Sequence, residues 1–85
     1  RKLEIIHLVD CSLRKIEQNS FSGVESSLKE LNLDNNLLTS TMDIFREVIR
    51  MRRLKVLNLS RNKITQLNRF IENINNNNNN NNNIL

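Results

Sequence analysis

The sequence predicts an α/β fold in which short parallel strands alternate with helical or irregular segments along a stack of similar coils. Three observations support this prediction. An apolar pattern recurs three times, in copies that begin at Leu3, Leu28 and Leu54 and so lie 25 and 26 residues apart. The centre of each copy alternates apolar and polar residues, which is typical of a strand. The segment after the second copy carries apolar residues at helical spacing.

The repeated pattern covers a window of eleven residues. Apolar residues occupy its first, fourth, sixth and eleventh positions, and Asn or Cys occupies the ninth. One copy cannot bury its apolar face alone, so the copies are expected to stack into a single core and a parallel sheet. The fourth and sixth positions are expected to point into that core, and they hold Ile6 and Leu8, Leu31 and Leu33, and Leu57 and Leu59.

This window resembles the leucine-rich repeat, whose period is about 20 to 29 residues. After the first window, Ile16, Phe21, Gly23 and Val24 follow at the spacing of the typical subtype of that repeat. The subtype is common in extracellular and cell-surface proteins, including the chaoptin-like adhesion group. The resemblance implies an α/β leucine-rich repeat solenoid, with short parallel strands on a concave face and helix or irregular turns on a convex face. Glu17 departs from the subtype, which often has proline there.

The ninth position of the window is occupied by Cys11, Asn36 and Asn62. The chain must turn out of the strand there, which leaves backbone N–H and C=O groups without partners in the sheet. An inward Asn amide can satisfy several such groups, and stacked side chains then form a ladder inside the turn. We expect these three to be structural ladder residues, with the Cys11 thiol buried.

The segments after the second and third windows are expected to cover the convex side of the core. A helix is predicted from about Met42 to Met51, capped by Ser40 or Thr41. Its core-facing residues are expected to be Met42, Phe45, Val48 and Ile49. The third repeat is expected to contribute Leu67, Phe70, Ile71 and Ile74.

The chain divides into three repeats and a tail. The repeats cover residues 1–74, at about 3–27, 28–53 and 54–74, and residues 75–85 form an Asn-rich low-complexity tail. This tail includes an unbroken run of nine Asn, which offers no apolar side chains to bury, so no fourth repeat is expected. Disorder, self-association through β-type ladders and an error in the gene model all remain open explanations for the run.

Both ends of the stack are expected to expose core residues, because the sequence shows no polar cap. The exposed residues at one end are expected to be Leu3, Ile6 and Leu8, and at the other Leu57, Leu59 and Leu67. We therefore expect these repeats to belong to a longer protein.

Strand residues that point away from the core are the expected partner-binding surface. The candidates are Glu4, His7, Asp10, Lys29, Asn32, Asp34, Lys55, Asn58 and Arg61. Their charges are mixed, which favours a protein partner over a polyanion. The aligned windows place His7, Asn32 and Asn58 in one row, and we expect the contact there. The alternative interpretation is that these residues are ordinary solvated strand positions.

A basic segment suggests a second kind of partner. Arg46, Arg50, Arg52 and Arg53 lie in the convex segment beside Glu47, and the net charge of the chain is +4. Such a cluster is compatible with nucleic acid, a glycosaminoglycan or membrane phosphate. No aromatic residues alternate with the arginines to stack on bases, so a solvated helix face is the preferred interpretation.

No catalytic, metal or cofactor site is expected. His7 is the only histidine, no glycine-rich phosphate loop is present, and His7 and Cys11 are predicted on opposite faces of the sheet. Asn58-Leu59-Ser60 is a formal N-glycosylation acceptor, although this motif arises readily from the repeat itself. No apolar run is long enough for a membrane helix.

The sequence thus predicts a non-enzymatic protein–protein interaction module from a larger cell-surface or secreted protein, adhesive or receptor-like. The alternative is an intracellular leucine-rich repeat scaffold or regulator, with which the lone Cys11 and the Asn tract agree. Polyanion binding through residues 46–53 is the third hypothesis. The oligomeric state is left open.

Overall fold

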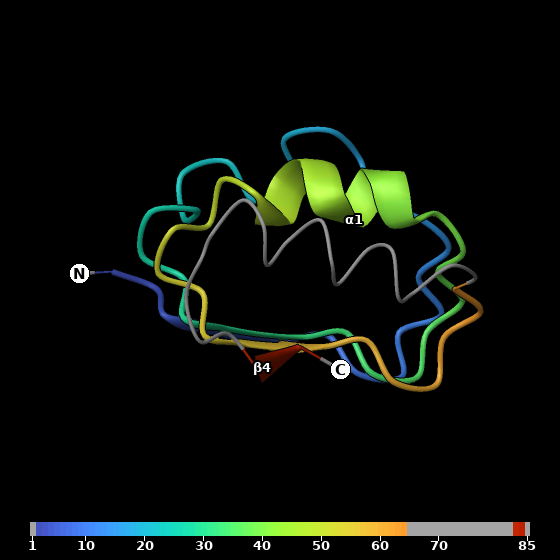
Figure 1. The fold of residues 1–85 in the computed structure, drawn as a ribbon. Helices are drawn as coiled ribbons and strands as arrows, with labels where there is room; N and C mark the ends of the chain where they lie inside the picture. The colour runs from blue at the N-terminus through green and yellow to red at the C-terminus, as the bar shows by residue number, and fades with distance from the viewer. Residues whose placement is uncertain (1, 65–82, 85) are drawn as a thin grey trace.

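The computed structural model of the chain describes residues 2–64 and 83–84 and shows a mixed α/β fold. Its elements are β1 (Ile5–His7), β2 (Glu30–Asn32), α1 (Thr41–Val48), β3 (Val56–Asn58) and β4 (Asn83–Ile84). All neighbouring strands pair in parallel, in the order β1-β2-β3-β4. The strands lie along one side of the molecule and α1 lies on the opposite side (Figure 1). The predicted mixed class with short parallel strands is therefore confirmed.

The register of the sheet follows the alignment of the three windows. Leu31 lies between Ile6 of β1 and Leu57 of β3. The same backbone contacts recur between neighbouring coils, as the N–H of Leu8 donates to the C=O of Asn32 at 2.8 Å and the N–H of Leu33 donates to the C=O of Asn58 at 2.8 Å. Because side chains alternate along a strand, this register places the side chains of Ile6, Leu31 and Leu57 in one row on the same face of the sheet.

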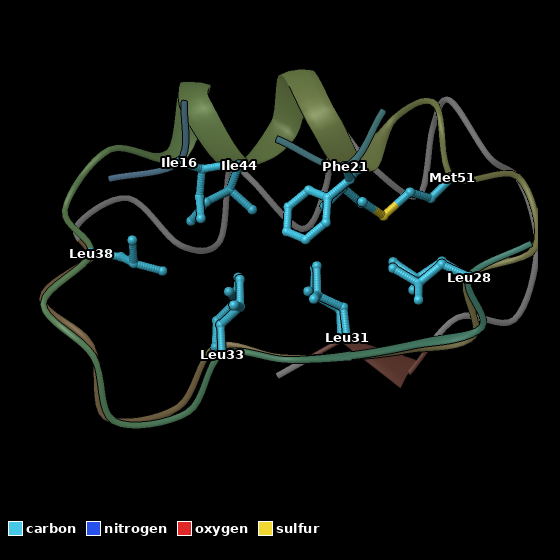
Figure 2. Packing of buried hydrophobic residues seen from close by; sticks show 12 residues of the cluster. Ile16, Phe21, Leu28, Leu31, Leu33, Leu38, Ile44 and Met51 are labelled. Carbon is cyan, nitrogen blue, oxygen red and sulfur yellow. The ribbon is translucent and has the colours of Figure 1, made fainter. Parts of the chain in front are cut away.

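A single core lies between the sheet and α1. Leu31 and Leu33 point into it from the sheet, Phe21 and Ile44 approach from the other side, and Leu28 and Leu38 close its two ends (Figure 2). The other fully or almost fully buried apolar residues are Ile16, Val48, Met51, Leu54, Leu57 and Leu59. At roughly 25 cal/mol per Å² of buried apolar surface, this core is the main source of stability.

Helix α1 begins at the predicted cap but buries a different face. Ser40 is the N-cap, and its side chain accepts a hydrogen bond from the N–H of Asp43 at 3.4 Å. The helix ends at Val48 rather than at Met51. The expected core-facing position Met42 is wrong, because that side chain is 68% exposed.

Two apolar stripes on α1 explain this error. Ile44, Val48 and Met51 are spaced four and three residues apart and are buried, whereas Phe45 and Ile49 are only partly buried. Met42, Phe45 and Ile49 are spaced three and four residues apart, so they make an equally regular stripe. Periodicity alone therefore does not choose between the stripes.

The two ends of the sheet differ in exposure. Leu3 is 48% exposed, and Ile6 and Leu8 are only partly buried, as expected for the first end. The expected exposure of Leu57 and Leu59 is wrong, since these residues are only 0% and 3% exposed. Strand β4 lies beside β3 at this end.

Strand β4 falls in residues 75–85, for which the sequence predicted an Asn-rich low-complexity tail. Asn83 pairs with Val56 and Ile84 pairs with Leu57, which precedes it by 27 residues (84 minus 57). Strand pairing uses backbone groups, so it does not require the apolar side chains that a full repeat needs. The predictions for Leu67, Phe70, Ile71 and Ile74, and for most of the Asn run, lie outside the described residues.

Candidate functional site

The candidate site is the face of the sheet that points away from the core, which we call the open face. Two rows of side chains cross it. His7, Asn32 and Asn58 form one row, in the predicted order, and the other row is Ile5, Glu30 and Val56. All six residues are exposed or partly buried. The strands hold these side chains at the regular spacing of about 4.8 Å between neighbouring strands.

Each strand is followed by the same tight turn. Asp10, Asn35 and Arg61 occupy equivalent positions of the three windows, and all have left-handed backbone, with φ of 58°, 57° and 54°. Asp and Asn tolerate this conformation well, whereas Arg does so less readily. The alignment did not predict this shared conformation, although Asp and Asn at two of the three positions are a signal for it.

Asn36 ties the second coil to the first from inside the turn. Its Oδ1 accepts hydrogen bonds from the N–H groups of Cys11 at 2.9 Å and Leu13 at 3.0 Å. Its Nδ2 donates to the C=O groups of Leu8 at 2.8 Å and Leu33 at 2.9 Å. Asn36 is buried, so one amide satisfies backbone groups of two coils in a place that water does not reach.

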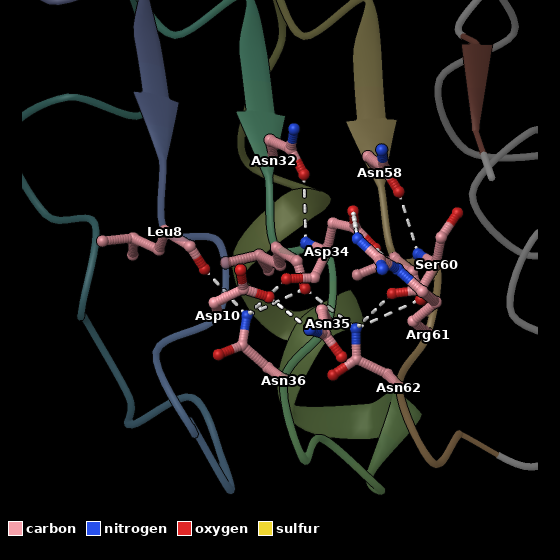
Figure 3. Close-up of polar contacts among 12 residues, drawn as sticks. Leu8, Asp10, Asn32, Asp34, Asn35, Asn36, Asn58, Ser60, Arg61 and Asn62 are labelled. Atoms are coloured by element: carbon pink, nitrogen blue, oxygen red, sulfur yellow. Dashed lines mark hydrogen bonds and ion pairs between the residues drawn. The ribbon is translucent and has the colours of Figure 1, made fainter.

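Asn62 makes a similar set of contacts one coil later, with one backbone N–H bound to its Oδ1 instead of two (Figure 3). Its Oδ1 accepts from the N–H of Leu38 at 3.0 Å, and its Nδ2 donates to the C=O of Leu33 at 2.8 Å and of Leu59 at 3.2 Å. In both coils the amide therefore reaches back to the preceding coil.

The expected burial of Cys11 is wrong, because the residue is exposed. Its thiol lies 3.4 Å from the C=O of Val9 in its own coil, and only its backbone N–H contacts Asn36. The direction of the Asn contacts explains the difference. A ladder residue reaches back towards the preceding coil, and the part of the chain that the structure describes contains no coil before the first.

Charged groups on and beside the open face are paired across neighbouring coils. Lys29 lies 3.4 Å from Glu4, and His7 Nε2 lies 2.5 Å from Glu30 Oε2. The remaining pairs are Asn35 with Asp10, and Arg61 with Asp34 through two bonds of 2.7 and 3.1 Å. The sequence predicted mixed charges but not these pairs, which depend on the register.

The ion pair of Asp34 and Arg61 lowers the pKa of the carboxyl and raises the pKa of the guanidinium. The hydrogen bond from Arg61, helped by its charge and opposed by desolvation, holds the pKa of Asp34 below its ordinary value. The hydrogen bond to Asp34 and its charge raise the pKa of Arg61 in return. Both groups thus stay ionised at neutral pH, and Lys55 is left as an exposed cation of this face without an ion pair among the described residues.

Asn32 and Asn58 are held in one orientation by their own backbone. The Oδ1 of Asn32 accepts from the N–H of Asp34 at 3.0 Å, and the Oδ1 of Asn58 accepts from the N–H of Ser60 at 2.9 Å. Their Nδ2 atoms point away from the turn (Figure 3) and donate to no described residue. No described side-chain N or O atom is both buried and unpaired, so these donors reach solvent.

The basic segment is organised around Glu47, whose side chain is 2% exposed. Its carboxylate accepts hydrogen bonds from Arg46 at 3.3 Å, from Arg50 at 3.0 Å and from the N–H of Asn19 at 3.0 Å. Arg46 also donates to the C=O of Ile16 at 3.2 Å. These contacts fasten α1 to the loop of the first coil, and sequence reasoning missed them because the loop partners lie about 30 residues away.

This arrangement changes the interpretation of the four arginines. Arg46 and Arg50 are already bound to Glu47, whereas Arg52 and Arg53 are exposed, with no ion pair among the described residues. A cluster of four free cations is therefore reduced to two, which weakens the case for a polyanion site.

Glu47 is expected to make stability depend on pH in acid. Burial would raise its pKa, but the hydrogen bonds from Asn19, Arg46 and Arg50 outweigh burial and hold the pKa below the ordinary value of 4.5. A carboxyl whose pKa is lowered by folding contributes stability above its unfolded pKa and loses it as pH falls through the folded pKa. We expect urea unfolding to give a constant Glu47 contribution from pH 7 to about 5 and a declining one below about 4.5.

The check is the difference between the chain and its Glu47→Gln variant across this range. That difference should shrink as the pH falls, because the variant has no carboxyl to protonate. A difference that stays constant down to pH 3 would contradict the assignment to Glu47.

Among residues 2–64 and 83–84, no group of three or more His, Cys, Asp and Glu residues is placed to hold a metal ion. Over the same residues, no helix combines the length and the apolar character needed to cross a membrane. Comparison of the chain with protein-family models, with curated protein sequences and with solved structures finds no match. The site is therefore interpreted from its residues and geometry.

Proposed function

We propose that the chain is part of a leucine-rich repeat solenoid whose open face binds a protein partner. The parent would be a cell-surface or secreted protein, adhesive or receptor-like, without enzymatic activity of its own. The fixed amide of Asn32, which faces His7 of the neighbouring strand in the register and whose Nδ2 donates to no described residue, is the main observation in favour. Groups that are already ordered lose little conformational entropy when a partner binds, so they favour specific contacts.

The charge pattern indicates what kind of partner fits this face. Glu4, Glu30 and Asp34 are each neutralised or contacted by a neighbouring side chain, so neither sign of charge dominates. Ile5 is exposed on β1, where it pairs in the register with Glu30, and adds apolar contact area. A protein surface of mixed polarity matches this combination better than a polyanion does.

An intracellular scaffold is the second candidate, and the exposed thiol of Cys11 favours it. Unpaired accessible thiols persist more readily in a reducing compartment than outside the cell. In both candidates the open face binds a protein partner, and only the cellular compartment differs.

The test is a screen of the immobilised chain against purified ectodomains, followed by affinity measurements with variants. We expect a double change, His7→Ala with Asn32→Ala, to weaken binding about tenfold or more, because hot-spot residues cost over 1 kcal/mol when truncated. The control is Arg52→Ala with Arg53→Ala, which leaves the open face intact and should leave affinity unchanged.

Thermal unfolding of each variant should be compared first, so that a loss of fold is not mistaken for a loss of contact. Binding that depends on Arg52 and Arg53, falls steeply with salt and tolerates the open-face changes would support the polyanion hypothesis and contradict this proposal.

A further inference from the structure

We propose that Asn58 is an acceptor for an N-linked glycan. Asn58-Leu59-Ser60 is the only Asn-x-Ser/Thr motif in the chain. The motif alone says little, because the repeat generates it readily. Among the described residues, the folded chain uses the oxygen of the Asn58 side-chain amide but not its nitrogen.

Asn58 can carry a substituent on Nδ2 without losing a contact. Its structural task is performed by Oδ1, which accepts the N–H of Ser60 at 2.9 Å. Its Nδ2 donates to no described residue and points away from the turn (Figure 3). An N-glycosidic bond leaves the amide oxygen unchanged, so the contact with Ser60 survives modification.

Other asparagines of the same turns show the opposite arrangement. In Asn36 and Asn62 the Nδ2 atom donates to backbone carbonyls of two coils, at distances from 2.8 Å. A sugar on either nitrogen would replace one of its two N–H donors, so at least one of these bonds would be lost, and the sugar would have to enter the core side of the turn. Asn32 shares the geometry of Asn58, but Asp34 stands where the motif needs a hydroxyl residue.

The chemistry is a group transfer without oxidation or reduction. The donor is an oligosaccharide activated as a lipid-linked diphosphate. The Nδ2 of Asn58 forms a bond to the anomeric carbon while the bond from that carbon to the diphosphate oxygen breaks. The lipid diphosphate leaves with the electron pair, and the amide nitrogen gives up one proton.

Such a glycan has a consequence for the binding surface. It would cover β3 and leave the row of His7 and Asn32 open on β1 and β2. A partner would then contact these two strands and avoid the third. The inference rests on the part of the proposed function that takes the chain through the secretory route.

The first test uses the protein isolated from its natural source. Trypsin cleavage after Lys55 and Arg61 releases the peptide 56–61, which contains Asn58. Peptide N-glycosidase in ¹⁸O water converts a glycosylated Asn to labelled aspartate. We expect the labelled peptide after treatment and little unmodified peptide before it, whereas recovery of the peptide only in unmodified form would overturn the proposal.

The second test measures whether the fold stays stable when Asn58 carries a glycan. The chain is secreted from eukaryotic cells, and glycan mass and melting temperature are measured. Asn58 should be modified with a melting temperature within a few degrees of the bacterial product, and Ser60→Ala should remove the glycan. Asp34→Ser creates a motif at Asn32, which should accept a second glycan and remain folded.

Ile64→Thr creates a motif at Asn62 and serves as the opposing control. Its glycosylated form should be retained in the cell or melt well below the same variant made in bacteria, which carries no glycan. Equal tolerance at Asn62 and Asn58, or a secreted folded chain that is unmodified at Asn58, would overturn the inference. Partner binding is measured on the bacterial chain, so its failure would be separate from failure here.

Discussion

Replacing Asn36 by leucine is expected to lower the free energy of unfolding by about 3 kcal/mol, the largest loss expected for any polar residue that the structure describes. The change leaves N–H groups of Cys11 and Leu13 and C=O groups of Leu8 and Leu33 without their partner. Leucine fills a similar volume but offers no polar atom. Because Asn36 is buried, water does not replace the lost bonds without opening the turn.

Urea unfolding followed by circular dichroism measures this loss. Asn36→Asp keeps the acceptor towards Cys11 and Leu13 but turns a buried carboxylate oxygen towards the C=O groups of Leu8 and Leu33, so at neutral pH it should be at least as destabilising as Asn36→Leu. The matched control is Asn32→Ala, which removes one local bond from a side chain whose amide nitrogen is in solvent, and about 1 kcal/mol or less is expected. Equal stability of Asn36→Leu and Asn32→Ala would refute the role of the Asn amide between coils.

Replacing Glu47 by alanine is expected to cost about 2 kcal/mol, because one carboxylate holds α1 and the first-coil loop together. The change frees the N–H of Asn19 and leaves Arg46 and Arg50 without their common partner. Loss of one partner of a fully buried ion pair costs about 3–5 kcal/mol. The expected value is smaller here because the two arginine side chains are 40% and 45% exposed and recover part of their hydration.

The control for Glu47 is Glu17→Ala. The carboxylate of Glu17 pairs with Lys15 at 3.3 Å, but its side chain is 73% exposed, so a change below about 0.5 kcal/mol is expected. Hydrogen exchange should also be faster at Asn19 in Glu47→Ala than in Glu17→Ala. Identical exchange at this amide would show that the loop is held by other contacts.

Local sequence determined the strands, their register and most of the core. Leucines at alternate positions of a strand all lie on one face, so only one pairing register buries them. A shift of the register by one residue would expose all of these leucines. The recurrence of the window at nearly constant spacing then places Ile6, Leu31 and Leu57 side by side. The row of His7, Asn32 and Asn58 follows from the same alignment, since facing residues in parallel strands inherit the register.

Tertiary structure decided features for which the sequence offers two equivalent choices or no local signal. Helix α1 has two apolar stripes, of which the one with Ile44 is buried and the one with Met42 is more exposed. The same helix is joined to the first-coil loop by the bond from the N–H of Asn19 to Glu47, and this contact has no signal in the local sequence. Cys11 is exposed because its coil is the first described one, which is a matter of position and not of residue type. Periodicity indicates which residues share a face. Contacts between segments 23 to 30 residues apart decide which face is covered, and therefore which hydrogen-bond donors remain free for a partner.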